Sequence, residues 1–162
     1  MRLLPIVALG LLLPLWPALG RSAEVAWKRH TVNAASEFPA CAALDVDHDG
    51  DLDIYSGGWW YEAPSWKQHK VREVEVIRGR FDDYANLPLD CNGDGWVDLI
   101  SVNYRSGAIY WIEHPAGKLG QQEWQVHLID KPGPSETGRL HDLDDDGDLD
   151  ILPNGTTYAA WY

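Results

Sequence analysis

Positive charge is scarce in this sequence of 162 residues, which has 13 Lys and Arg against 25 Asp and Glu. The formal net charge is −12, and it becomes −13 when residues 1–20, with one base and no acid, are set aside. Such a chain has no basic patch that could neutralise phosphates, which excludes nucleic acid as a partner. Three short segments hold 14 of the 25 acids. Acid concentrated in this way favours metal binding over a generally solvated surface.

Long apolar runs are missing except at the start of the chain. Arg2 precedes an apolar stretch from Leu3 to Trp16, and Ala18-Leu19-Gly20 offers the small residues that a signal peptidase reads. We therefore predict a signal peptide at 1–20 and an exported protein that is secreted, periplasmic or at the cell surface. The run is short and contains two prolines, which disfavours a membrane span. A retained N-terminal anchor is the alternative; after signal removal we expect no membrane contact.

Cysteine is limited to Cys41 and Cys91. An exported protein can keep a disulfide, and two cysteines allow one pairing, but two small buried thiols are the alternative. No stretch of helical period is visible beyond the first twenty residues. A Ser-His-Asp set, a Gly-rich phosphate loop and a Cys-x-x-Cys motif are also absent. The sequence therefore favours a binding protein over an enzyme.

Three features recur in a fixed order, which identifies an internal repeat. A Trp-x-x-His-x-Val/Ile segment comes first, an aspartate-rich loop second and an aromatic segment third. The first segments begin at Trp27, Trp66 and Trp124, the loops begin at Asp45, Asp90 and Asp142, and the aromatic segments are 59–64, 110–115 and 160–162. The distance from the tryptophan to the first loop residue is 18 residues in the first and third copies and 24 residues in the middle copy, which has a longer connection.

Each copy has the pattern of short β-strands. A short apolar stretch follows each loop, and glycine-containing turns come next. Aromatic and β-branched residues dominate the segment after the turn, as a pleated surface prefers. The loops start 45 and 52 residues apart, a period typical of a four-stranded propeller blade. We predict an all-β fold, a partial β-propeller of about three four-stranded blades over 21–162, in copies of about 27–65, 66–123 and 124–162.

The three aspartate loops share one pattern, with oxygen-bearing side chains at positions 1, 3, 5 and 9 and glycine at position 6. Calcium prefers six to eight oxygen ligands, and glycine permits the sharp turn. We predict that these side chains bind calcium together with the backbone carbonyl at position 7. The candidate ligands are Asp45, Asp47, Asp49, Asp51 and Asp53 in loop 1, Asp90, Asn92, Asp94, Trp96 and Asp98 in loop 2, and Asp142, Asp144, Asp146, Asp148 and Asp150 in loop 3. Loop 2 carries less charge, so we expect it to bind more weakly.

The loops also resemble two other kinds of acidic segment. An EF-hand needs helical flanks and a Glu at position 12, where this chain has Ser56, Ser101 and Pro153. Acidic turns without metal stay open as an alternative, because Asp is common in turns. Soft ligands are absent from the pattern, which disfavours zinc and copper.

These motifs resemble the FG-GAP/VCBS repeat family, whose calcium loops are similar to those of integrin α-subunit propellers. The likeness lies in Asp-x-Asp/Asn-x-Asp-Gly-x-x-Asp before an apolar pair, and in Trp-Tyr-Glu or Trp-Ile-Glu, over about residues 24–162. The resemblance implies a seven-bladed propeller that binds calcium and acts as a binding or adhesion scaffold for an extracellular protein or carbohydrate. The alternative that it implies is part of a carbohydrate-active lyase or dehydratase. Three copies are too few to close a propeller, so we expect a fragment of a longer protein, with a strand-exchanged homodimer as the other interpretation.

The sequence has six histidines, a residue type common in catalytic sites. His30, His69 and His127 recur at equivalent repeat positions, which indicates a structural role beside the tryptophans of the outer strands. We expect His48 and His114 to be exposed.

His141 and Arg139 precede loop 3 and are the candidate ligand-face residues. Arg139 and Arg80 either line a central pocket for an acidic sugar or balance nearby aspartates. Most tryptophans should pack between blades, because aromatic side chains bury large areas in cores. Sugar stacking is the alternative for Trp59 and Trp60.

Overall fold

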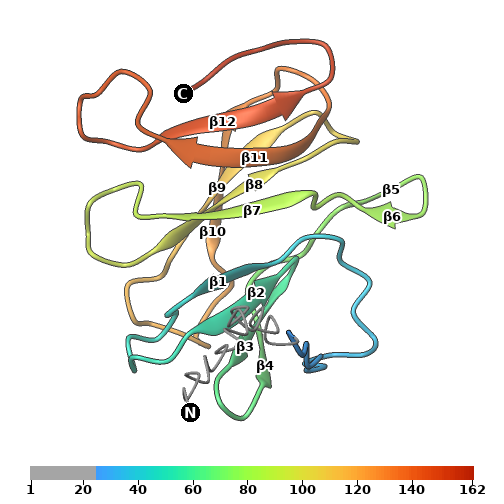
Figure 1. Cartoon of the computed structure of the whole chain (residues 1–162), viewed down its shortest axis with the longest axis vertical. Coiled ribbons are helices and arrows are strands. Elements are labelled where there is room, and N and C mark those ends of the chain that lie inside the picture. Colours follow the sequence, from blue (N-terminus) through green and yellow to red (C-terminus); the bar gives the residue numbers. More distant parts are fainter. Residues whose placement is uncertain (1–24) are drawn as a thin grey trace, which may run out of the picture. The chain divides into compact units, whose positions relative to one another are not determined.

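β-Strands make up all the regular secondary structure in the computed structural model, which describes residues 25–162 (Figure 1). The predicted signal peptide at 1–20 lies outside these residues. The strands are β1 (Ala42–Leu44), β2 (Asp53–Ser56), β3 (Trp59–Glu62), β4 (Lys67–Lys70), β5 (Val76–Ile77), β6 (Arg80–Phe81), β7 (Ala85–Leu89), β8 (Asp98–Val102), β9 (Ile109–Glu113), β10 (Gln125–Asp130), β11 (Ser135–His141) and β12 (Asp150–Gly155). Residues 25–162 contain no helix long and apolar enough to cross a membrane. The predicted all-β class is confirmed.

Two of the sheets have the four strands of a propeller blade. One has the order β1-β2-β3-β4 and the other β10-β9-β8-β7, so each is a meander in which consecutive strands are neighbours. All their pairings are antiparallel. The third copy contributes the pair β11-β12, and β5-β6 is a separate hairpin. These small antiparallel sheets are consistent with partial propeller blades.

The third copy repeats the register of the other two. Ile54 pairs with Tyr61 and Leu99 with Ile112. The Tyr162 amide donates to the Ile151 carbonyl at 3.2 Å, and the Ile151 amide donates back at 2.9 Å. Tyr162 therefore occupies the position of Tyr61 and Ile112, although residues 160–162 are not an assigned strand.

His30 was expected beside Trp27 on an outer strand, and this is wrong, because residues 27–32 have no regular structure and Trp27 is 92% exposed. A strand persists only through a hydrogen-bonded ladder to a neighbour, and none joins this segment within residues 25–162. All of the strands lie in the unit that spans Thr31–Tyr162.

The first strands of the three copies are neighbours in space. Within Thr31–Tyr162, β7 contacts both β1 and β11, and Figure 1 shows the three strands at corresponding places in their copies. Each aspartate loop leaves the end of one of these strands and returns into the second strand of the same copy. The loops are therefore held by the first two strands of each copy.

Strand alternation decides which side chains fill the space between the first two sheets. Tyr55 and Trp60 are directly opposed across β2 and β3, and Leu99 and Ile112 are opposed across β8 and β9. All four are buried in one apolar cluster together with Val71 and Trp124 and others. The predicted packing of tryptophans between blades is confirmed for Trp60 and Trp124, which are 3% and 4% exposed. It is wrong for Trp66 and Trp161, which are 38% and 50% exposed.

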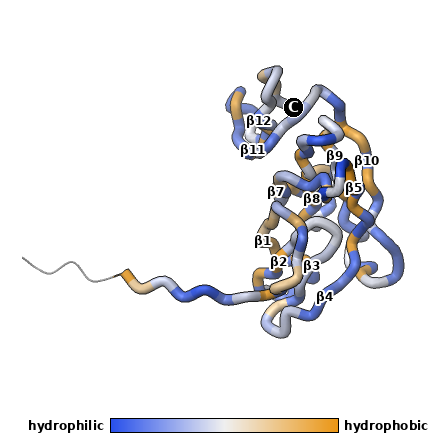
Figure 2. The backbone as a smooth tube through the Cα atoms, turned by 90° about the vertical axis from the view of Figure 1, so that its right-hand side faces the viewer, coloured by the Kyte–Doolittle hydropathy of each residue, from blue (hydrophilic) through white to orange (hydrophobic). Residues whose placement is uncertain are grey.

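The opposite face of the second sheet packs on the third copy. Ile100, Val102, Ile109 and Ile151 form a second buried cluster, with Trp111 half-buried beside it. The outer strands differ in hydropathy, since β4 is blue and β10 carries orange segments (Figure 2). Val126 and Leu128 on β10 are 45% and 60% exposed. Apolar side chains thus stay accessible on the outer edge of the second sheet.

Candidate metal centre

The three aspartate loops have the same hydrogen-bonded frame. The position-1 carboxylate accepts from the glycine amide at position 6 at 3.1, 2.9 and 3.0 Å in loops 1, 2 and 3. The position-5 carboxylate accepts from the amide at position 7 at 2.8, 2.9 and 2.9 Å. The position-9 carboxylate accepts from the amide at position 2 at 3.0, 3.0 and 2.7 Å. Three copies of one bond pattern show that the sequence motif encodes one loop shape.

Backbone conformation explains the residue types at two loop positions. The position-6 glycines Gly50, Gly95 and Gly147 have φ of 94°, 87° and 99°. Side-chain-bearing residues rarely adopt such angles, so glycine is required there. Position 4 is also left-handed, with φ of 61° at His48 and Asp145 and 70° at Gly93. The chain therefore turns sharply at the centre of each loop, which brings positions 1, 3 and 5 to one side.

The position-9 aspartates join the loop to the rest of the sheet. Asp53 is 1% exposed, and its other oxygen accepts from the Ala63 amide at 2.8 Å. Asp98 is fully buried and accepts from the His114 amide at 2.8 Å in the same way. Burial raises the pKa of Asp53, and the amides of Ala63 and Val46 oppose that rise. Each of these carboxylates ties its loop to the residue that follows the third strand of the sheet.

Two loops gather carboxylate oxygens in the manner of a cation site. In loop 1, Asp45, Asp47 and Asp49 each offer an oxygen within 4.8 Å of the others. In loop 3, Asp142, Asp144 and Asp146 do the same. Oxygen atoms of this density repel one another unless a cation lies between them.

The surroundings of Asp45 Oδ1 show whether a cation would fit in loop 1. This oxygen is buried and has no hydrogen-bond partner, while Oδ2 is held by the loop frame. A buried carboxylate oxygen without a donor is costly, and a cation would satisfy it. Hard oxygen donors of this kind suit calcium or magnesium better than zinc. The residues at positions 1, 3 and 5 of loops 1 and 3 therefore fit a hard divalent cation, and the buried oxygen without a donor lies in loop 1.

Loop 2 keeps the frame but presents fewer free oxygens. Asp90 Oδ1 accepts from the Gly93 and Asp94 amides at 2.8 and 3.2 Å. The Asn92 side-chain amide donates to Asp94 Oδ2 at 3.3 Å. This loop closes on itself with internal hydrogen bonds, and it is not among the carboxylate clusters of the described residues. Its weaker affinity stays a prediction.

Comparison with known families agrees with the loop geometry. Residues 90–152 match the family model described as an FG-GAP-like repeat. These residues form an FG-GAP-like repeat. The segment starts at the first aspartate of loop 2 and ends just after loop 3, so it holds both loops and the strands between them. Searches of curated proteins and of solved structures found no match.

The FG-GAP-like repeat begins with a loop that is stacked on its neighbour. Trp96, at position 7 of loop 2, stacks on His48 of loop 1 at 3.8 Å and on His114 at 4.7 Å between ring centroids. His114 was expected to be exposed, and this is wrong: it is 2% exposed, and its Nε2 lies 2.9 Å from the Val46 carbonyl. Burial lowers the pKa of His114, which favours the neutral ring that this stack accommodates. His48 is exposed as expected, although one ring face is covered.

Two of the three recurring histidines, His69 and His127, occupy one structural arrangement on the outer strands, whereas His30 lies in a segment without regular structure. His69 Nε2 lies 2.6 Å from Glu62 Oε2, and its ring stacks on Trp60 at 4.3 Å. His127 Nε2 lies 2.7 Å from Glu113 Oε2. Its ring stacks on Trp111 at 4.5 Å. The repeated Trp, Glu and His of the motif therefore meet on one sheet face, which agrees with a structural role.

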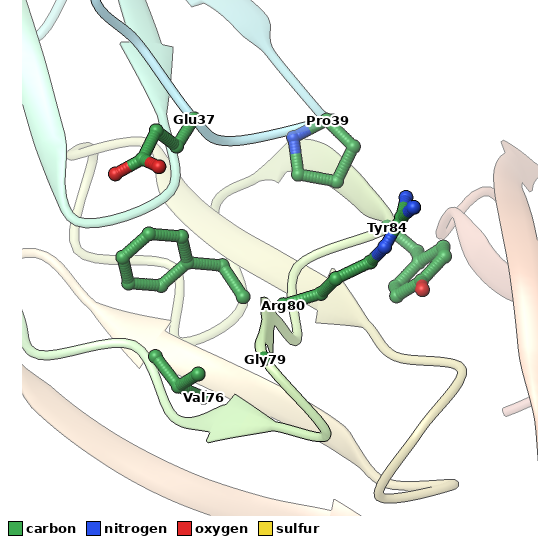
Figure 3. Close-up of a pocket in the computed structure, with 7 residues that line it drawn as sticks. Glu37, Pro39, Val76, Gly79, Arg80 and Tyr84 are labelled. Atoms are coloured by element: carbon green, nitrogen blue, oxygen red, sulfur yellow. The ribbon is translucent and has the colours of Figure 1, made fainter.

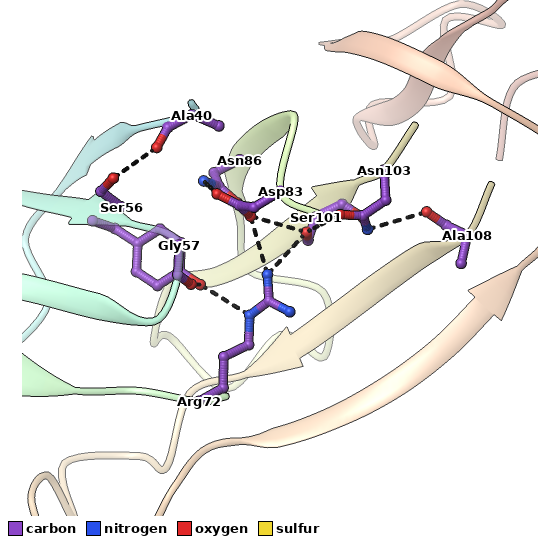
Figure 4. Close-up of polar contacts among 10 residues, drawn as sticks. Ala40, Ser56, Gly57, Arg72, Asp83, Asn86, Ser101, Asn103 and Ala108 are labelled. Atoms are coloured by element: carbon purple, nitrogen blue, oxygen red, sulfur yellow. Dashed lines mark hydrogen bonds and ion pairs between the residues drawn. The ribbon is translucent and has the colours of Figure 1, made fainter. Parts of the chain in front are cut away.

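A buried polar network lies between the first two sheets and was missed from the sequence (Figure 4). Arg72 is 6% exposed and donates to Asp83 Oδ1 and Ser101 Oγ, each at 3.1 Å. Its Nε donates to the Tyr55 hydroxyl at 3.2 Å. Asn86 donates to the second oxygen of Asp83 at 3.0 Å. The only signal in the sequence is that Arg72 directly follows the predicted outer strand.

The candidate ligand-face residues both lie on β11. Arg139 lines a shallow depression of about 360 Å³ with Thr137, Leu152 and Asn154. His141 is exposed and pairs with Asp150 across β12. His141 is not among the residues that line this depression, so the two are not brought together around one cavity.

The cysteines follow neither prediction made for them. Cys41 and Cys91 are both free, and both are exposed. They are therefore not a disulfide and not buried thiols. Cys41 directly precedes β1, and Cys91 lies at position 2 of loop 2, so the fold assigns them to separate surface segments.

Proposed function

We propose that this chain is an exported, calcium-stabilised binding module that presents a surface to an extracellular protein or carbohydrate. The observation that carries the calcium part is the pair of aspartate triads, with a buried Asp45 oxygen that lacks a donor. The FG-GAP-like repeat over 90–152 supports the same function. Export is supported by the signal-like segment at 1–20.

Calcium would act here on stability. Each loop joins the first and second strands of its copy, and in loops 1 and 3 the backbone frame brings the carboxylates together. A divalent ion would neutralise their repulsion and hold the turn, and any ligand that binds only the folded state stabilises it. In this proposal the ion is structural, and recognition belongs to the surfaces that the loops hold in place.

Thermal unfolding with and without calcium tests the proposal. At a calcium concentration one hundred times the dissociation constant, linkage gives about 2.7 kcal/mol per site. For a domain of this size that corresponds to a rise in Tm on the order of 5–10 °C for one site. Magnesium at the same concentration should give a smaller rise, since it dehydrates reluctantly.

A matched pair of variants in loop 3 locates the effect. Asp142→Asn removes a charge at position 1 and should weaken calcium binding to this loop about tenfold or more, or ~1.4 kcal/mol. Asp145→Asn removes the same charge at exposed position 4, where φ is 61° and Asn is tolerated. Binding is measured by isothermal titration calorimetry. An unchanged melting curve in chelator, or equal losses in both variants, would contradict the proposal.

A further inference from the structure

The middle copy departs from the repeat at one place. Its connection from tryptophan to loop is 24 residues, against 18 in the other two copies. The difference is accounted for by the hairpin of β5 and β6, which spans Val76–Phe81 and turns at Arg78 and Gly79 with φ of 52° and 74°. The other copies have no such hairpin in the described part of the chain. Insertions into single repeats lie on one face and are often the binding face.

The hairpin forms one wall of a pocket (Figure 3). The pocket has a volume of about 270 Å³ and is lined by Val76, Arg80 and Phe81 from the hairpin. Glu37 and Pro39 line it from the segment before β1, and Tyr84 from the segment before β7. Ligand pockets commonly range from about 300 to 1,000 Å³, so this one has room for one small ring.

The pocket walls are fixed by contacts outside the pocket. Asp82 is 5% exposed and accepts from the amides of Arg105 and Ser106 at 2.8 and 2.9 Å. Its own amide donates to the Glu75 carbonyl at 2.9 Å, which holds the base of the hairpin. Tyr84 packs against Tyr104 with ring centroids 5.6 Å apart.

The opposite wall is anchored through Phe38. Its ring lies 4.5 Å from that of Phe81, and it fills the space above Gly57, where a Cβ would come within 2.1 Å of it. The adjoining Ala40 carbonyl accepts from Ser56 Oγ at 2.9 Å. Glu37 and Pro39 are therefore positioned before any ligand arrives, and such preorganisation lowers the cost of binding.

The two charged side chains of the pocket have no charged partner in the described part of the chain. Neither Glu37 nor Arg80 belongs to any of the ion pairs between residues 25 and 162. A carboxylate only accepts hydrogen bonds and a guanidinium only donates them. Together with two aromatic rings they match a ligand that has an apolar ring face and hydroxyl groups able to do both. One charge of each sign leaves the pocket without net charge, which disfavours an anionic ligand.

We propose that this pocket binds a neutral pyranose ring of a glycan, with Arg80 and Glu37 bonding its hydroxyls and Phe81 and Tyr84 contacting its ring face. The proposal rests on the proposed function as a binding module and names its ligand. It is independent of calcium ligation, because none of the lining residues belongs to an aspartate loop. Loss of sugar binding with an intact calcium effect on Tm would therefore overturn this proposal alone.

The test is saturation-transfer NMR on the full chain in calcium, with the methyl glycosides of glucose, galactose, mannose and N-acetylglucosamine as probes and glucuronate as the anionic comparison. At least one neutral glycoside should receive saturation. Arg80→Gln and Glu37→Gln should each weaken its binding at least tenfold. Arg78→Gln is the matched control, since it makes the same change two residues away in the same hairpin and does not line the pocket.

Folding of each variant is checked by circular dichroism, and all three positions are exposed, so the fold should persist. Saturation of no neutral glycoside would overturn the proposal. Saturation of glucuronate alone would also overturn it. A neutral glycoside that binds equally well to wild type, Arg80→Gln and Glu37→Gln would place the sugar elsewhere and overturn it as well.

Discussion

Replacing Arg72 with methionine should destabilise this protein more than any change of surface charge. The guanidinium lies 3.1 Å from the fully buried Asp83 carboxylate. At an effective dielectric constant of 20, the attraction between unit charges at that distance is about 5 kcal/mol. Methionine keeps much of the apolar stem but leaves the Asp83 charge buried without its partner, which typically costs about 3–5 kcal/mol.

Urea unfolding in saturating calcium measures the effect. The Arg72→Met midpoint should fall while the m-value stays unchanged, because the same surface is exposed on unfolding. Lys67→Met is the control, since Lys67 is an exposed residue of β4 and its free energy of unfolding should not change measurably. The double variant Arg72→Met/Asp83→Asn should recover about 2 kcal/mol, because the unpaired charge is gone. The amide oxygen of the new side chain still accepts from Asn86, and its NH2 group can donate to the Ser101 hydroxyl.

The cost of Arg72→Met should also depend on pH. Burial raises the pKa of Asp83 above its ordinary 3.8, and Arg72 opposes that rise. Removing Arg72 therefore raises the pKa of Asp83 in the folded state further. As the pH falls, the folded variant binds a proton at Asp83 at a higher pH than the unfolded chain does. Stability relative to wild type is then regained as the pH falls through the raised pKa towards 3.8. A cost below about 1 kcal/mol at pH 7, or one that grows on acidification, would refute the reasoning.

Two further variants probe the loop frame and the pocket wall. Asp98→Ala removes a buried carboxylate that accepts from two main-chain amides at 3.0 and 2.8 Å. Its free energy of unfolding, measured with urea in chelator, should fall by about 3 kcal/mol. Asp148→Ala, at an exposed loop position, is the control, and an equal loss in both variants would contradict the assigned role of Asp98. Gly57→Ala would place a Cβ within 2.1 Å of Phe38 at φ 61°, so a loss of about 2–4 kcal/mol is expected. Gly79→Ala has a similar φ of 74° but open space around it, so equal losses would show that Phe38 moves aside freely.

The hydrogen bonds of the aspartate loops could be predicted from local sequence. Glycine at position 6 and oxygen side chains at positions 1, 5 and 9 form the same hydrogen bonds in all three copies. These bonds span at most seven residues, so residue type and spacing are enough to specify them. The Glu62–His69 pair is equally local, since it spans seven residues and joins two strands connected by a short turn, whereas Glu113 and His127 are 14 residues apart and lie on strands joined by a longer connection.

His114 shows where that reasoning stops. Its place after an aromatic strand indicated exposure, but the ring is buried against Val46 and between Trp96 and Trp124. Val46 is 68 residues away in the sequence. No local pattern reports which side chains a second sheet brings against a strand, because burial depends on packing between sheets.

By itself the sequence determined the repeat, the all-β class and the three aspartate loops, since each depends on residues close together in the chain. Only the tertiary structure decided that Arg72 meets Asp83, that Trp96 stacks between two histidines, and that the six-residue insertion closes a pocket against Glu37. The physical reason is the range of the forces involved. Turn geometry and strand alternation act within a few residues, whereas burial, ion pairing and concave surfaces arise only when sheets encoded by separate copies pack together.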